Sequence, residues 1–157
     1  MIRGKLRNRK NIKFVNAKIA EMLNDIADAF VGQTKSNLKK KKDIHGVSFA
    51  PLEDSTIRAK KKKGSSFPRT PLIDTGAMRK IYRSKTASAS SLESKVTVAE
   101  KRKEVAEFHN EGGGNLPQRE WFGIGTKLER RLNKMIRAKI KSIVRFEKWR
   151  IMKTQVH

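Results

Sequence analysis

Few residues of this sequence combine the types and the spacing that catalysis requires. General acid–base chemistry needs a positioned pair of titratable groups, and the one local cluster is Glu107, His109 and Glu111, spaced two residues apart. Residues two apart on a helix point to different sides, so we expect His109 to cap or pack rather than to catalyse or to bind a metal. The chain has no cysteine, which excludes thiolate nucleophiles, disulfides and cysteine-ligated metals. We therefore expect neither a metal nor another cofactor.

A second candidate for chemistry is the segment Leu72-Ile73-Asp74-Thr75-Gly76-Ala77. It resembles the D-T-G segment that carries the catalytic aspartate of retroviral-type aspartic proteases, and the resemblance implies a homodimer that shares two carboxylates and one proton. Those proteases are built almost wholly from strands, whereas here the residues after Gly76 favour a helix and the chain ends in a long helix. A protease therefore remains the less favoured alternative, and we expect the protein not to be an enzyme.

Charge is the strongest compositional signal. The 38 Lys and Arg residues exceed the 15 Asp and Glu residues by 23, which predicts a polyanion or an acidic protein as partner. Aromatic residues make up 6% of the chain, too little for a base-stacking platform. Any contact with DNA should then be to phosphates and independent of sequence, and a non-specific DNA-binding protein is the main alternative function.

The candidate contacts with DNA or acidic partners fall into three groups of basic residues. Six recur at three- and four-residue intervals on one side of a predicted C-terminal helix, and eight form two four-lysine runs. They are Arg130, Lys134, Arg137, Lys141, Arg145 and Lys148 on the helix, and Lys39, Lys40, Lys41, Lys42, Lys60, Lys61, Lys62 and Lys63 in the runs.

Two amphipathic helices should position these groups. Apolar residues recur at helical spacing from Phe14 to about Leu38, and again from about Lys127 to Trp149. Between them we expect a short helix over 77–82, a hairpin within 84–99, a helical turn near 105–108 and a short strand over 119–125. The predicted fold is therefore α+β, a small antiparallel sheet of hairpin plus short strand packed against long N- and C-terminal helices.

Two segments look different from this domain. Residues 1–13 hold six basic side chains and no acid, which predicts a basic N-terminal arm. Residues 39–71 combine both lysine runs with Gly and Pro, which predicts a long basic loop that becomes ordered on assembly. The expected organisation is thus an arm at 1–13 and a single domain at 14–157 that includes this loop. No apolar stretch approaches 18 residues, so we expect no transmembrane helix and no membrane partner.

Four uncommon segments follow one another in a recognisable order. They are Gly46-Val47-Ser48-Phe49-Ala50-Pro51-Leu52, Leu72-Ile73-Asp74-Thr75-Gly76-Ala77-Met78, Val105-Ala106-Glu107-Phe108-His109-Asn110-Glu111-Gly112 and Pro117-Gln118-Arg119-Glu120-Trp121-Phe122-Gly123. Their order and spacing resemble the virion-morphogenesis or tail-completion proteins of tailed bacteriophages over about residues 14–146. The family pattern reads G-x-x-W/F-x-P-L, L-x-D-T-G-x-L, Y-A-x-x-H-x-x-G and P-x-R-x-F-L-G. This chain departs from it with Met78 for Leu, Val105 for Tyr, Trp121 for Phe and Phe122 for Leu.

The resemblance implies a structural protein of the head–tail neck or tail end that joins a completed tail to a DNA-filled head. It implies a ring of identical subunits, with a hexamer as one candidate size, that contacts adjoining neck and tail proteins and, through its basic residues, DNA. The protein is then expected in the virion, and in the host cytoplasm during assembly. Candidate subunit-contact residues are Phe49, Pro51, Leu52, Arg119, Trp121 and Phe122. For Trp121 and Phe122, a place in the internal core is an equal alternative.

Overall fold

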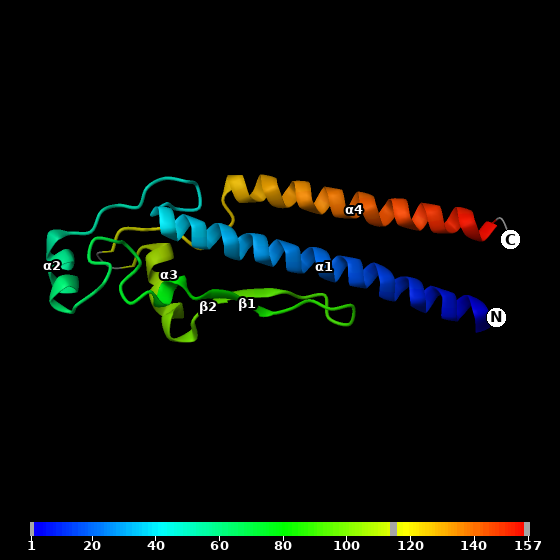
Figure 1. Cartoon of the computed structure of the whole chain (residues 1–157), viewed down its shortest axis with the longest axis horizontal. Helices are drawn as coiled ribbons and strands as arrows, with labels where there is room; N and C mark the ends of the chain where they lie inside the picture. The colour runs from blue at the N-terminus through cyan, green and yellow to red at the C-terminus, as the bar shows by residue number, and fades with distance from the viewer. Residues whose placement is uncertain (1, 114–115, 156–157) are drawn as a thin grey trace.

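The computed structural model describes the backbone of residues 2–113 and 116–155, and the side chains of residues 12–113 and 116–152. Long connections join several of the helices and strands (Figure 1). In chain order they are α1 (Ile2–Lys40), α2 (Asp54–Lys62), a 3₁₀ turn (Ala77–Arg79), β1 (Ile81–Lys85), β2 (Lys95–Val98), a 3₁₀ turn (Glu100–Arg102), α3 (Lys103–Glu111) and α4 (Thr126–Gln155).

The two long helices, α1 and α4, run antiparallel side by side, so that the N-terminal end of α1 and the C-terminal end of α4 lie at the same end of the molecule (Figure 1). Phe14 of α1 stacks on Phe146 of α4 near that end, with ring centroids 4.4 Å apart. Midway, the Lys139 ammonium lies 3.1 Å from the Glu21 carboxylate. In the other half of the pair, the two helices pack through a small apolar cluster formed by Ala29, Leu128 and Leu132 with Ile26, Phe30 and Met135.

The hairpin of β1 and β2 packs against α1, on the side away from α4 (Figure 1). The strands are antiparallel, with Ile81 opposite Val98. Asn24 of α1 fixes the hairpin, because its side chain donates to the Ala87 carbonyl at 3.0 Å and accepts from the Ala87 N–H at 2.9 Å. The hairpin is thus attached to α1 by specific hydrogen bonds as well as by apolar contact.

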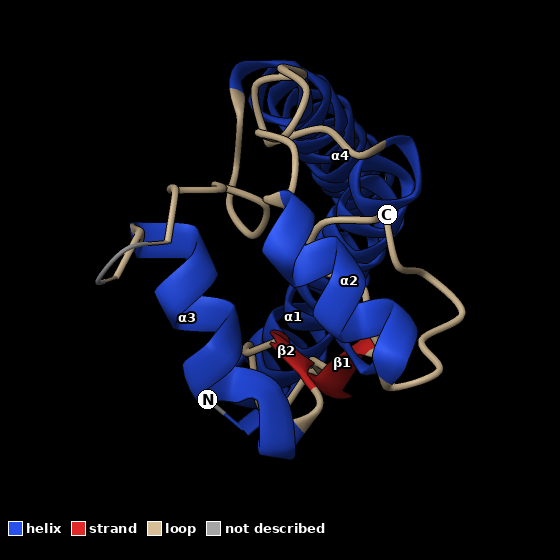
Figure 2. Cartoon of the chain, turned by 90° about the vertical axis from the view of Figure 1, so that its left-hand side faces the viewer, coloured by secondary structure: helices blue, strands red, loops and turns tan. Residues whose placement is uncertain are grey.

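The main core lies where the C-terminal end of α1 meets the hairpin and α3. Its largest member is Trp121, which is fully buried and donates its indole N–H to the Ala106 carbonyl at 3.2 Å. The other buried members come from these elements and from the connection between α2 and β1: Leu38, Leu72, Met78, Ile81, Val98 and Ala106. Viewed along the long helices, α2 and α3 stand in front of this core (Figure 2).

The α+β class is confirmed, with long N- and C-terminal helices and a small antiparallel sheet. The C-terminal helix runs six residues beyond the predicted Trp149. None of the helices in the described part of the chain is long and apolar enough to cross a membrane. Met1 of the expected arm, and residues 156–157 of the expected domain, lie outside the described residues.

Three local predictions need correction. The expected arm is helical from Ile2, because residues 2–13 contain no proline and mostly good helix formers, a preference that outweighs charge repulsion. The expected loop over 39–71 contains α2, whose first turn holds Asp54 and whose last turn is basic, an arrangement that the helix dipole stabilises. The expected helix over 77–82 is one 3₁₀ turn, after which β1 begins.

The predicted short strand over 119–125 is also absent, so the described sheet has two strands. The backbone N–H groups of this segment are used elsewhere. Arg119 N–H donates to the His109 carbonyl at 2.7 Å, and the N–H groups of Trp121 and Phe122 both donate to the Asn110 side chain at 3.1 Å. The segment therefore binds the end of α3 instead of a strand.

Candidate functional site

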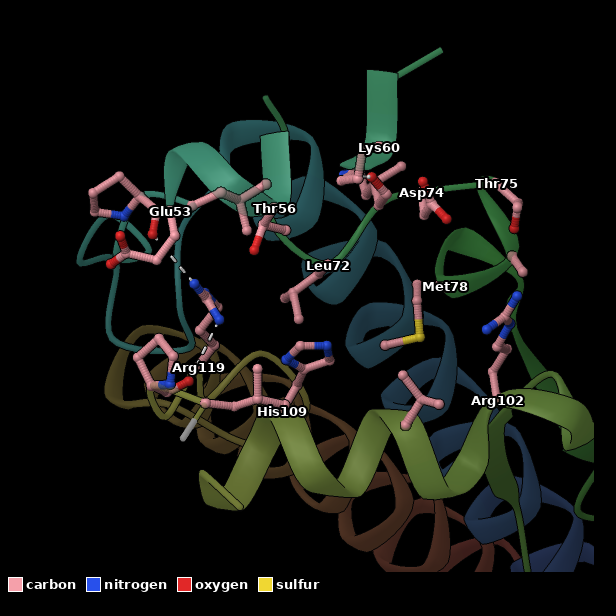
Figure 3. A pocket seen from close by; sticks show the side chains of 17 residues that line it. Glu53, Thr56, Lys60, Leu72, Asp74, Thr75, Met78, Arg102, His109 and Arg119 are labelled. Carbon is pink, nitrogen blue, oxygen red and sulfur yellow. Dashed lines mark hydrogen bonds between the residues drawn. The ribbon is translucent and has the colours of Figure 1, made fainter. Parts of the chain in front are cut away.

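The four motif segments, far apart in the sequence, line one open pocket of about 360 Å³. Figure 3 shows Leu72 and Met78 pointing into it from one side and His109 of α3 from another. The first segment contributes Pro51 and Leu52, and the fourth contributes Arg119. The four motif segments thus meet at a single junction between loops and α3.

Arg119 holds this junction together. It is 3% exposed, and its guanidinium donates from Nη2 to the carbonyl of Ala50 at 3.2 Å. Burial lowers the pKa of Arg119, although an arginine stays charged at any ordinary pH. A buried charge that is hydrogen-bonded to backbone is costly to remove, because it leaves unsatisfied carbonyls behind. Arg119 is therefore a structural residue of the loop that carries Phe49 to Leu52.

His109 does not belong to an acid–base cluster. Burial, and secondarily the nearby Arg119, lower the pKa of His109, so the imidazole is neutral at pH 7. Its Nδ1 is buried without a hydrogen-bond partner in the described part of the chain. Glu107 and Glu111 are exposed and border a recess beside β2, not the pocket that His109 lines. Within the described ranges no three metal-ligating side chains gather either.

The D-T-G segment lies in a loop that leads into a 3₁₀ turn, and not between strands. Asp74 is exposed, and Gly76 has φ +81° just before the turn at Ala77–Arg79. Only glycine adopts that left-handed conformation readily, so the turn explains the glycine. This geometry gives the protease alternative no support.

The two lysine runs have different environments. Lys39, Lys40, Lys41 and Lys42 are exposed, as are Lys61, Lys62 and Lys63. Lys60 instead donates its ammonium to the carbonyls of Thr70 at 2.9 Å and Ile73 at 2.7 Å. Burial lowers the pKa of Lys60. Its charge thus anchors the second motif, and a contact of Lys60 with a partner stays a prediction.

The basic side of α4 is exposed to solvent. All six predicted residues are exposed, and none forms an ion pair with a described residue. We call them the basic face: Arg130, Lys134, Arg137, Lys141, Arg145 and Lys148. Lys139 differs, because it points to α1 and pairs with Glu21 and Asp25. The basic face is therefore uncompensated positive charge on a rigid helix.

The candidate subunit-contact residues divide into buried and accessible ones. Trp121 and Arg119 lie inside the subunit. For Trp121 this confirms the alternative of a place in the internal core, and for Arg119 it corrects the expected subunit contact. Phe122 is half-buried and meets Phe30 edge to face at 5.0 Å. Phe49 and Leu52 are half-buried and Pro51 is exposed. A contact through Phe49, Pro51, Leu52 or Phe122 stays a prediction.

One residue with a central role was missed from the sequence. Asn110 accepts the two N–H groups of Trp121 and Phe122 at one side-chain oxygen. It directly follows His109 in the third motif, yet its type carries no chemistry that would single it out. Its role depends on the fourth motif folding back onto α3, which only the structure shows.

The fold and its junction define a small, basic α+β subunit in which the motif residues stabilise loops and the basic face of α4 is exposed. The model of the phage virion morphogenesis family matches residues 6–141. The chain belongs to this family, as the motif resemblance indicated, and is a structural, morphogenetic protein of a bacteriophage. The searches of the curated proteins and of the solved structures found no match.

Proposed function

We propose that this protein completes the phage tail or neck and joins the tail to the DNA-filled head, as a ring of identical subunits and without enzymatic activity. Membership of the virion morphogenesis family supports an assembly role. The basic face of α4 is the observation that carries the joining role, because a rigid row of exposed cations needs acidic surfaces or phosphates to neutralise it.

The basic face has two candidate targets at the head–tail junction, the acidic surfaces of adjoining neck proteins and the DNA that passes through the neck. A channel through which DNA slides should hold phosphates weakly. We therefore assign the basic face mainly to acidic protein neighbours, and assign any DNA contact to the exposed lysines at Lys39–Lys42 and Lys61–Lys63.

The experiment is a charge reversal in the phage itself, Lys134→Glu, Arg137→Glu and Lys141→Glu together. We expect intact heads and tails that remain unjoined in electron micrographs, and a sharp loss of infectious particles. The control reverses Lys35, Lys80 and Lys101, which are equally exposed but lie off α4, and should leave infectivity near normal. Normal particles from the α4 variant would contradict the proposal.

A free DNA-binding protein is the remaining alternative, and salt distinguishes it. Such a protein would bind duplex DNA by itself, with an affinity that falls by several orders of magnitude between about 50 and 200 mM salt. The purified subunit should instead bind short duplexes weakly, and electron microscopy of phage particles should find it at the head–tail junction.

A further inference from the structure

An exposed apolar row runs along α4 beside the basic face. Ile136, Ile140 and Val144 follow one another at four-residue spacing from the buried Leu132, so they form one ridge of the helix. Ile136 is half-buried, whereas Ile140 and Val144 are 49% and 48% exposed. This row of β-branched residues is bordered by cations. It is therefore complementary to a protein surface that is acidic and also carries an apolar side chain.

The same chain holds a surface of that kind on α3. Glu104, Glu107 and Glu111 are exposed and form one row along the helix. Glu107 and Glu111 border a recess beside β2 and Phe122. None of the three forms an ion pair with another residue that the structure describes. Phe108 borders this acidic row and is 58% exposed. In a chain with 23 excess positive charges, this outer face of α3 is locally acidic and apolar.

The two surfaces match in spacing. The acidic residues of α3 are separated by three and four positions, and so are Lys134, Arg137 and Lys141 of the basic face. With the two helix axes parallel, each of the three carboxylates of α3 can face one of the three cations of α4 in register. Seen along the helix axes in one direction, Phe108 and Ile140 lie on opposite flanks of their charged rows. When two parallel helices face each other, these flanks meet, so that Phe108 and Ile140 lie on the same side of the contact. An antiparallel arrangement would place them on opposite sides.

Within one molecule these surfaces cannot meet, because α1 lies between α4 and the side that carries α3 (Figures 1 and 2). We propose that the outer face of α3 docks onto the basic and apolar rows of α4 of a second copy of this chain. The contact joins two different patches, so it is head-to-tail, and head-to-tail contacts close into rings when the rotation allows it. The inference rests on the proposed ring and gives it a subunit interface. It makes a second copy of this chain the acidic neighbour that faces Lys134, Arg137 and Lys141.

The test uses two complementary charge reversals in the full chain. One variant changes Glu104, Glu107 and Glu111 to Lys, and the other changes Lys134, Arg137 and Lys141 to Glu. In low salt the wild type should form oligomers in analytical ultracentrifugation, whereas each variant alone should stay monomeric. An equimolar mixture of the two variants should assemble again, because every contact then pairs opposite charges. The control Lys35→Glu, Lys80→Glu, Lys101→Glu should assemble like the wild type.

Circular dichroism shows whether each variant is folded. If a triple variant fails to fold, the single changes Phe108→Ser and Ile140→Ser keep the test open, since both side chains are exposed. Each should weaken assembly by about tenfold or more, as expected for an apolar residue at the centre of an interface. The same change at Leu92, which is 43% exposed in the connection between β1 and β2, should have no effect.

Three outcomes would overturn the inference: a wild-type chain that stays monomeric in low salt, assembly of both folded variants at wild-type strength, or a folded mixture that does not assemble. None of them refutes the joining function. That function fails independently, if electron microscopy of native particles finds no copies of the chain where the head meets the tail.

Discussion

The guanidinium of Arg119 donates to the carbonyl of Ala50 across 69 positions of sequence, at 3.2 Å. This bond ties the fourth motif to the first, while the backbone N–H of the same arginine donates to the His109 carbonyl in the third. One residue therefore holds three of the four motif segments in place. Their shared occurrence in the sequence is explained by a common structural task.

The first prediction concerns that arginine. Arg119→Lys keeps the charge but loses the planar, multi-donor guanidinium, so it should lower the free energy of unfolding by about 1.5–3 kcal/mol, the range for hydrogen bonds to charged groups. Urea unfolding followed by circular dichroism measures the loss. The matched control is Arg130→Lys on exposed α4 surface, which should be neutral, and equal stability of the two variants would refute the role of Arg119.

The second prediction separates the two tryptophans. Trp121 is fully buried, whereas Trp149 is 50% exposed. Trp121→Ala should cost about 3–5 kcal/mol through the lost burial and the cavity it leaves. Trp149→Ala should cost about 1 kcal/mol, because much of its ring is already in water. Thermal unfolding of both variants measures the two losses of stability. A larger loss for Trp149→Ala than for Trp121→Ala would contradict the place of Trp121 in the core.

The long helices and the hairpin could be predicted from the sequence because their signals are local. Apolar residues recur over many turns in α1 and α4, and Val96 to Val98 follows a turn-rich stretch. The helix α2 could not be predicted in this way, because its lysines and lack of buried residues resemble a solvated loop. Its stability depends on the ends of the helix, and on Lys60 reaching carbonyls of a later loop.

The site could be predicted only in part. The basic face of α4 needs one helix and its period, and it was predicted residue by residue. The burial of Trp121 and Arg119 depends on a loop that folds back onto α3, through partners up to 69 positions away. No local pattern records such long-range contacts. For the same reason the motif segments could be ordered along the chain, but not assembled into one pocket.

The third prediction compares two glycines. A Cβ added at Gly125 would lie 1.9 Å from the carbonyl oxygen of Ile44, whereas one added at Gly32 of α1 would meet nothing within 4 Å. Gly125→Ala should therefore destabilise by about 1–3 kcal/mol or more. Gly32→Ala should stabilise by about 0.5–1 kcal/mol, because alanine favours the helix. Chemical denaturation of the two variants should give changes of opposite sign, and a stabilised Gly125→Ala would disprove the close approach.

The fourth prediction concerns pH and His109. Burial and Arg119 lower the pKa of His109 in the folded chain, while the unfolded chain keeps a value of about 6.5. As the pH falls below about 6.5, the unfolded chain takes up the proton first, which favours unfolding. Stability should therefore be complete above this pH and decline as the pH falls through the lowered pKa of the folded state.

His109→Gln removes the titrating group, so its urea midpoint should change less between pH 7.5 and pH 5 than that of the wild type. The control is Thr75→Ser, because Thr75 is exposed at the same pocket and carries no titrating group, and it should keep the wild-type decline. Since wild type and control have the same titrating groups, a smaller change in His109→Gln comes from the imidazole of His109. An unchanged pH dependence in His109→Gln would show that the imidazole is solvated and that the pocket wall is looser than the structure has it.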